Sequence, residues 1–259
     1  MKLFNLNIAL KIDNDKEVVD LILKDKYDIV TLQESVRKLD EDVYHIFDTC
    51  GYICRTTKYK NNFFGPLWLG RQRRGDGSLA IDFGGYAEQG NQFLTNLPIV
   101  EAKNIFFYQD YAIYEDATNF RRDDHPRAFT DVIVKVGEKE LQIINIHGAW
   151  SVDKKGNART KLQTKAILKR VRHDIPSIVV GDVNLLPDTK EIKKMSKKMT
   201  NLIDKYNIQS TRPDFDDGLD VGNLVCDYIF VNDKVKVNDF IVMDTNVSDH
   251  LPLILDFDI

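Results

Sequence analysis

The stretch Ser177–Asn184, Ser-Ile-Val-Val-Gly-Asp-Val-Asn, is the clearest guide to the fold of this chain. Its continuous apolar run is typical of a strand that is buried on both faces of a sheet. A glycine and two polar residues, Asp182 and Asn184, follow directly, so their side chains lie at the end of that strand. Taken alone, these two residues also fit an ordinary turn. Their meaning depends on what lies at the ends of the other strands.

Several other apolar runs also include or adjoin a polar residue that can bind a metal or transfer a proton. These residues are Asn7, Glu34, His147, Asp227, Asp249 and His250. Because adjacent strands bring their ends to a common rim, we expect the side chains to gather in one place. A cluster of Asp, Glu, Asn and His without cysteine is rich in oxygen ligands, which hard divalent cations such as Mg²⁺ or Mn²⁺ prefer.

The order of strand-like and helical patterns predicts an α/β fold with two sheets that face each other and helices outside them. We expect helices from about Asp15 and over Ser35–Phe47, Ala158–Arg172 and about Thr189–Tyr206, and long loops over Lys58–Ser78, Gln109–Pro126 and Gln209–Val225. The expected strands are Lys2–Leu10, Asp28–Leu32, Leu79–Phe83, Gln92–Thr95, Asn104–Tyr108, Phe129–Val136, Leu141–His147, Ser177–Val180, Tyr228–Val231, Phe240–Met243 and Leu253–Phe257. No linker divides the chain, so we expect residues 1–259 to form a single domain.

Composition narrows the class of protein further. The 259 residues carry 36 Lys and Arg against 40 Asp and Glu, so a polybasic nucleic-acid binder is excluded by net charge, although local basic patches are not. The three cysteines fit buried free thiols in a reducing compartment better than a disulfide framework. No apolar run reaches the roughly 18–20 residues that cross a bilayer. We therefore expect a soluble, cytoplasmic monomer without a membrane partner.

The polar motifs, taken in order, resemble those of the endonuclease/exonuclease/phosphatase superfamily, the DNase I-like proteins. Besides Asn7, the resemblance rests on Leu32-Gln33-Glu34-Ser35, Asn145-Ile146-His147, Gly181-Asp182-Val183-Asn184, Asp227-Tyr228-Ile229 and Ser248-Asp249-His250. It spans nearly the whole chain. The resemblance implies a four-layer α/β/β/α sandwich of two mixed, mainly antiparallel sheets with outer helices. It also implies cleavage of phosphoester bonds with a divalent metal, Mg²⁺, for which Mn²⁺ is expected to substitute.

The resemblance assigns metal and water chemistry to one group of residues. Glu34 would be the main metal ligand, and Asp249 would lie at the metal or beside it. Asp182 would orient or deprotonate the attacking water, and Asn184 would hold that water or a phosphate oxygen. Asn7 would form a hydrogen bond with Asp182.

Phosphate contacts are assigned by the same resemblance to a second group. His250 would contact the scissile phosphate, and Asp227 would fix the tautomer of the His250 ring. His147 would also contact the phosphate. Arg127, at the start of a strand, is a phosphate-binding candidate; the other interpretation is a solvated arginine at the strand entry.

The motif style is nearest to the tyrosyl-DNA phosphodiesterase-like and general nuclease members. Tyr228 stands where inositol-polyphosphate 5-phosphatases carry an arginine, which argues against that activity. Basic residues in Ala158–Arg172, and Arg71, Arg73 and Arg74 beside Trp68, suit nucleic-acid phosphates and bases, or are simply solvated charges. We expect a DNA or RNA nuclease or phosphodiesterase. The alternatives are a phosphatase or phospholipase-C-type enzyme acting on a small phosphoester or lipid head group, and an inactive binding module.

Overall fold

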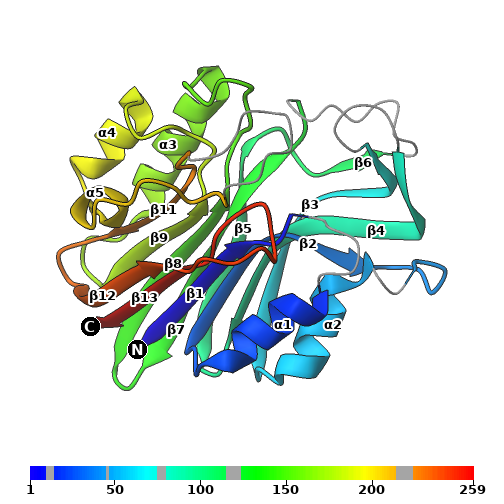
Figure 1. Cartoon of the computed structure of the whole chain (residues 1–259), viewed down its shortest axis with the longest axis horizontal. Coiled ribbons are helices and arrows are strands. Elements are labelled where there is room, and N and C mark those ends of the chain that lie inside the picture. Colours follow the sequence, from blue (N-terminus) through cyan, green and yellow to red (C-terminus); the bar gives the residue numbers. More distant parts are fainter. Residues whose placement is uncertain (10–14, 45–46, 75–79, 115–123, 214–223) are drawn as a thin grey trace.

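Two facing sheets and a few outer helices make up the computed structural model (Figure 1). It describes residues 1–9, 15–44, 47–74, 80–114, 124–213 and 224–259. The seven-stranded sheet has the spatial order β12 (Lys236–Val242), β13 (Leu253–Asp258), β1 (Lys2–Asn7), β2 (Ile29–Lys38), β4 (Ala80–Thr95), β3 (Asn61–Arg74) and β6 (Ala112–Tyr114).

The six-stranded sheet contains the segment with which the sequence analysis began. Its spatial order is β10 (Thr200–Asn201), β11 (Asp227–Val231), β9 (Ser177–Asp182), β8 (Lys139–His147), β7 (Arg127–Val136) and β5 (Ile99–Tyr108). Most neighbours in both sheets are antiparallel, whereas β1 with β2, β3 with β6 and β8 with β9 are parallel. The predicted fold class, two mixed and mainly antiparallel sheets, is confirmed.

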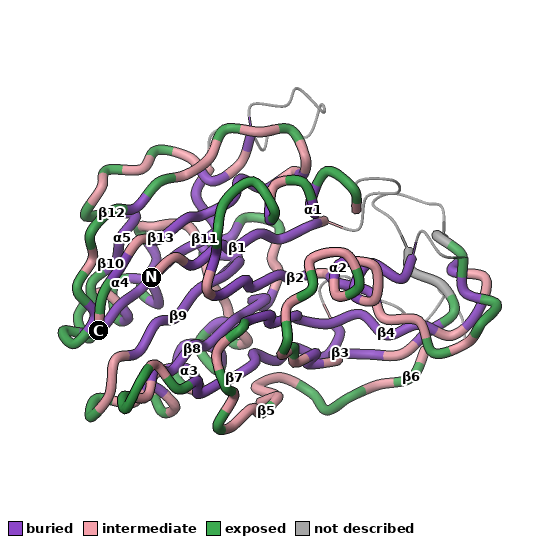
Figure 2. The backbone as a smooth tube through the Cα atoms, turned by 90° about the horizontal axis from the view of Figure 1, so that it is seen from below, coloured by how far each residue is buried: buried purple, intermediate pink, exposed green. Residues whose placement is uncertain are grey.

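Helices cover the outer sides of the sheets (Figure 1). On the first sheet lie α1 (Asp15–Lys24) and α2 (Thr49–Thr57), and on the second lie α3 (Ala158–Arg170), α4 (Lys190–Ser196) and α5 (Leu202–Lys205). Between the sheets, apolar side chains of both form one core, in which Leu3 and Phe93 of the first sheet pack with Ile143 of the second. Figure 2 shows the buried residues concentrated in the strands.

Buried amides of β1, β2 and β8 also join the two sheets. The Gln33 side chain donates to the Oδ1 atoms of Asn145 (2.6 Å) and Asn5 (2.8 Å). The Asn145 amide in turn donates to the main-chain oxygens of Leu32 and Gln92, both at 3.1 Å. Because buried amides are costly to leave unpaired, this network fixes the register of one sheet against the other.

Several sequence predictions of local structure are wrong, and the two expected strands Leu79–Phe83 and Gln92–Thr95 are parts of the single strand β4. The expected helix Ser35–Phe47 is not formed, because β2 continues to Lys38 along β4. The expected loop Lys58–Ser78 contains the whole of β3. The expected helix Thr189–Tyr206 is broken into α4 and α5, because Asn201 pairs in β10 and its side chain then caps α5.

The two other expected loops and the cysteines complete the comparison. Residues 115–123 and 214–223 of the loops lie outside the described residues, and β6 occupies part of the first. All three cysteines are free thiols as expected, but Cys54 is only half-buried. Among the described helices, none is long and apolar enough to cross a membrane.

Candidate functional site

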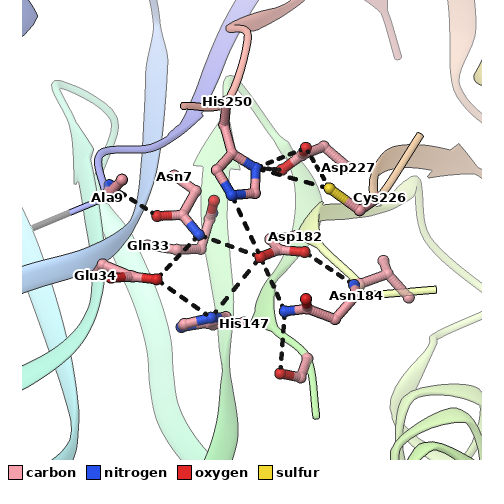
Figure 3. A network of polar contacts seen from close by, with 12 residues as sticks. Asn7, Ala9, Gln33, Glu34, His147, Asp182, Asn184, Cys226, Asp227 and His250 are labelled. Carbon is pink, nitrogen blue, oxygen red and sulfur yellow. Dashed lines mark hydrogen bonds and ion pairs between the residues drawn. The ribbon is translucent and has the colours of Figure 1, made fainter. Parts of the chain in front are cut away.

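Most of the predicted site residues meet where β1 and β2 of the seven-stranded sheet face β8, β9 and β11 of the six-stranded sheet (Figure 3). Asn7 is the last residue of β1. His147 ends β8 opposite Asp182, which ends the parallel strand β9. Asp227 begins β11 and pairs with Asp182 from the other side. The register of three neighbouring strands therefore places His147, Asp182 and Asp227 in one row.

Glu34 reaches this row through a bulge in β2. The register against β4 shifts between Leu32 and Ser35, and Glu34 has a φ of 62°, which is unusual for a residue other than glycine. Leu32 packs under the outer helices, whereas Gln33 points between the sheets. Regular alternation would turn Glu34 outward again, so the bulge re-aims its carboxylate along the rim.

The re-aimed Glu34 carboxylate lies among polar groups of three other strands. Its Oε1 atom is 3.5 Å from Nδ2 of Asn7 and 3.7 Å from Nε2 of His147. Its Oε2 atom accepts a hydrogen bond of 3.4 Å from the Gln89 side chain in β4. The structure thus brings Glu34 together with the strand-end residues, as the motif order predicted.

One carboxylate oxygen, Oδ2 of Asp182, is the centre of the cluster. It accepts hydrogen bonds from the side-chain amides of Asn7 (3.2 Å) and Asn184 (2.9 Å). The Nε2 atoms of His147 and His250 each lie 3.8 Å from it. Burial raises the pKa of Asp182, so this carboxyl is a stronger proton acceptor than a solvated one.

The close approach of β8 explains the glycine that precedes Asp182 in β9. Gly181 has a φ of 131°, and a Cβ atom there would lie 2.2 Å from the main-chain oxygen of Ile146. Only glycine fits both the backbone conformation and the close approach of β8. Asn184 adopts a left-handed φ of 58°, which asparagine tolerates better than most residues. Its main-chain N–H donates to Oδ1 of Asp182 at 2.9 Å.

Lys154 is a site residue that the sequence analysis missed. It lies between β8 and α3, it is buried, and its Nζ atom donates to Oδ1 of Asn184 at 2.6 Å. This bond fixes the orientation of the amide, so Nδ2 of Asn184 faces Asp182. No local pattern marked Lys154, because it lies in a polar loop with Lys155 beside it.

His250 and Asp227 form a buried pair. Nδ1 of His250 lies 2.8 Å from Oδ2 and 3.0 Å from Oδ1 of Asp227, and Thr211 donates to the same carboxylate at 2.9 Å. Burial alone would lower the pKa of His250, but the charge and hydrogen bond of Asp227, together with Cys226 and Asp249, outweigh burial and hold that pKa well above its ordinary value. Burial would likewise raise the pKa of Asp227, and the His250 charge lowers it. The ring is therefore oriented by Asp227, with Nε2 toward Asp182.

His147 and Arg127 lie on the opposite side of Asp182. Burial lowers the pKa of His147 well below its usual value, and the charge of Arg127 adds to the effect, so the imidazole is neutral. Within the described part of the chain, its Nδ1 atom has no hydrogen-bond partner. Arg127, the first residue of β7, is 4% exposed, which excludes the interpretation as a solvated arginine.

Asp249 lies at the open edge of the site and is the most exposed of the predicted residues. Its side chain is 36% exposed and forms an ion pair of 2.7 Å with Arg212. Arg212 was not predicted as a site residue. The segment that carries it lies in an expected loop, where nothing in the local sequence sets this arginine apart.

The donor atoms fit a hard divalent cation on the Glu34 side of the cluster. Carboxylate oxygens of Glu34 and Asp182 make up that side, and Nδ2 of Asn7 donates to both, while Oδ1 of Asn7 accepts from the main-chain N–H of Ala9. A second group of possible metal ligands consists of Asp182, Cys226, Asp227 and His250. Their ligand atoms lie within 4.8 Å of one another. Cys226 was not expected there, and burial raises the pKa of its thiol, which disfavours the thiolate form that binds metals. The carboxylate oxygens on the Glu34 side therefore suit a hard cation better than this second group.

Comparisons with known proteins give the family and the fold of this chain. The model of the Endonuclease/Exonuclease/phosphatase family matches residues 4–250, and a search of curated proteins returned no match. The solved structure of an endonuclease/exonuclease/phosphatase from Beutenbergia cavernae is 15% identical with a TM-score of 0.73, and the alignment covers 99% of this chain and 71% of that one.

Two further solved structures share the fold along their whole length. Humanized D. rerio TDP2 is 14% identical with a TM-score of 0.65, covering 100% of this chain and 99% of that one. The Bacteroides thetaiotaomicron mannosyl-6-phosphatase Bt3783 is 15% identical with a TM-score of 0.65, covering 100% of both chains. With its motif set assembled on this fold and its family model matched over nearly its full length, the chain belongs to the endonuclease/exonuclease/phosphatase family, whose members are hydrolases acting on phosphoester bonds.

Proposed function

We propose that this protein is a divalent-metal-dependent phosphoesterase that hydrolyses phosphodiester bonds of nucleic acid, DNA or RNA, by attack of water. The observation that carries the proposal is the convergence of Asn7, Asn184, His147 and His250 on Oδ2 of the buried Asp182. Such a carboxylate, held by two amides and raised in pKa by burial, suits the removal of a proton from water.

Each group of the cluster has a task in this reaction. Glu34, with Asp249 at the metal or beside it, would hold Mg²⁺ or Mn²⁺, and the cation when bound supplies positive charge against the phosphate oxygens. Asp182 takes the proton of the attacking water, while Asn7 and Asn184 hold its carboxylate in place. Phosphoryl transfer requires mainly positioning and charge neutralisation, which buried polar groups supply at little cost of reorganisation.

Three cationic or imidazole groups line the place where phosphate would bind. His250 contacts the phosphate through Nε2, because Asp227 occupies its other ring nitrogen. Arg127 and neutral His147 contact it from the opposite side of Asp182.

The exposed face of α3 supports nucleic acid as the substrate. Lys161, Lys165 and Lys169 follow at intervals of four residues, so they form one exposed stripe. The remaining basic residues of this region contribute less, because Arg170 is paired with Asp131. The helix α3 begins shortly after Lys154 of the site. Its lysine stripe therefore suits the phosphates of a nucleic-acid strand that extends from the site.

The structure does not support the second basic feature expected from the sequence, the arginines beside Trp68, as a platform for stacking bases. Arg71, Arg73 and Arg74 belong to β3 rather than to a loop, and Trp68 is completely buried beside Phe83. Trp68 therefore has no face on which a base can stack. The proposal that nucleic acid is the substrate consequently rests on the α3 stripe.

Neutralising the α3 stripe tests the substrate class. We expect the triple variant Lys161→Gln, Lys165→Gln, Lys169→Gln to bind a 20-nucleotide oligonucleotide about tenfold more weakly at low salt, with a shallower salt dependence. Turnover of bis-p-nitrophenyl phosphate should stay unchanged. The matched control replaces three exposed lysines of the α4 region, Lys193, Lys194 and Lys197, by glutamine.

Two outcomes would contradict nucleic acid as the substrate. Equal oligonucleotide affinities of the two triple variants would show that the stripe is only a solvated helix face. Release of inorganic phosphate from small monoesters, without cleavage of any oligonucleotide, would favour the phosphatase alternative instead.

A further inference from the structure

Arg212 contacts the two residues of the site that lie at its open edge. Its Nη2 atom donates to Oδ2 of Asp249 at 2.7 Å, and its Nη1 atom lies 2.6 Å from Nε2 of His250. The arginine side chain is only 14% exposed, so the guanidinium lies within the site rather than in solvent. The described residues thus place a permanent positive charge directly on the nitrogen through which His250 would contact phosphate.

The backbone before Arg212 is fixed by hydrogen bonds. The Thr211 hydroxyl donates to Asp227 and accepts from the main-chain N–H groups of Cys226 and Asp227, each of the latter at 3.1 Å. The Thr211 main-chain oxygen accepts from Leu251 at 2.8 Å. Thr211 therefore links the backbone at Arg212 to the Asp227 carboxylate, which also orients His250. Asp227 thus helps to position both side chains.

His250 and Arg212 bring two donor groups to one point at the edge of the site. Asp227 lies against Nδ1 of His250, so Nε2 is the ring nitrogen that faces the site, and a guanidinium only donates. Nη1 of Arg212 lies 2.6 Å from Nε2 of His250, so both groups can reach the same oxygen. A phosphate oxygen at this point satisfies both donors.

The contacts that Arg212 would give up are inexpensive to break. Asp249 is 36% exposed, and an ion pair with one solvated partner contributes little to stability. A guanidinium has five N–H donors in a planar fork that matches phosphate oxygens in pairs. Exchange of the His250 contact for a phosphate contact is therefore favourable as soon as an anion enters.

We propose that Arg212 is a further catalytic residue, which donates hydrogen bonds to the non-bridging oxygens of the scissile phosphate together with His250. This inference rests on the proposed function, because it concerns the same phosphoester. The competing interpretation is a purely structural ion pair, in which Arg212 serves only to hold Asp249 and the segment 209–213.

Two substitutions at position 212 separate these interpretations. We expect Arg212→Gln to lower kcat/KM by about 10²- to 10³-fold, the usual effect of removing one donor to a developing oxyanion. Arg212→Lys should retain the charge but lose the fork, and so give an intermediate value. Arg55→Gln, which removes an exposed arginine paired with Asp48, is the control and should leave kcat/KM unchanged.

A binding measurement makes the test independent of turnover. Calorimetry of inorganic phosphate in the presence of Mg²⁺ should give a Kd at least about tenfold higher for Arg212→Gln than for the unmodified protein and the control. Wild-type kcat/KM and phosphate affinity in Arg212→Gln, with only a lower Tm, would overturn the proposal. If the unmodified protein hydrolyses no phosphoester, the proposed function fails, whereas the phosphate Kd still decides the role of Arg212.

Discussion

Asp182→Asn is expected to lower kcat by about 10³-fold or more, with a far smaller change in KM. The amide keeps the size of the side chain and an oxygen that accepts from the side chains of Asn7 and Asn184, but it gives up the bond from the main-chain N–H of Asn184 and cannot take a proton from water. Because the substrate contacts assigned to His250 and Arg127 stay in place, ground-state binding should be preserved. Single-turnover and steady-state hydrolysis of the best substrate would measure both effects.

The same substitution should leave stability unchanged or raise it. Burial raises the pKa of Asp182 in the folded state above its unfolded value, so the ionised carboxylate opposes folding at neutral pH. Replacing it by a neutral amide removes that penalty, which we expect to appear as an equal or higher Tm at pH 7. Asp174→Asn, at an exposed carboxylate outside the site, is the control. Full activity of Asp182→Asn would refute its assignment as the base.

Glu34→Gln should abolish the response to metal. As the proposed main ligand, Glu34 would contribute the negative charge that a divalent cation requires, and even changes next to a ligand cost about 10- to 100-fold in affinity. We therefore expect the Kd for Mn²⁺, measured by calorimetry, to rise by more than about 100-fold, with a loss of kcat of about 10³-fold. Glu41→Gln changes an exposed glutamate and should bind Mn²⁺ as the unmodified protein does.

An unchanged Mn²⁺ affinity in Glu34→Gln would move the metal elsewhere. The alternative place is the buried group of Asp182, Cys226, Asp227 and His250. Asp227→Asn would then lose the metal, whereas on our assignment it disturbs chiefly the orientation of the His250 ring.

Much of the site could be predicted from sequence, because the ends of neighbouring strands lie close together in the fold. A polar residue directly after an apolar run marks the rim of a sheet, and the register then brings His147 opposite Asp182 and Asp182 opposite Asp227. Lys154 and Arg212 escaped the analysis for a physical reason. Both reach the site from loops through long, flexible side chains. The periodicity of apolar residues does not predict where the charged end of such a side chain lies.

The failures in secondary structure have equally local causes. The segment after Leu32 has helical spacing, but the bulge at Glu34 allows β2 to continue along β4. Gly65 and Pro66 in β3 are typical of a loop. Gly65 is needed for a close approach instead, because a Cβ atom there would lie 2.5 Å from Thr130 of the facing sheet. Tertiary packing thus decides both cases against local propensity.

Metal-dependent hydrolysis is the measurement that tests the central claim most directly. Purified protein would be assayed in Mg²⁺, in EDTA and after return of Mg²⁺ or Mn²⁺, on single- and double-stranded DNA, RNA, a 5′-tyrosyl oligonucleotide and small phosphoesters. We predict cleavage of an oligonucleotide that EDTA stops and the metal restores, and that Asp182→Asn lacks under all conditions. Turnover that persists unchanged in EDTA, or its complete absence on every phosphoester with metal present, would contradict the account.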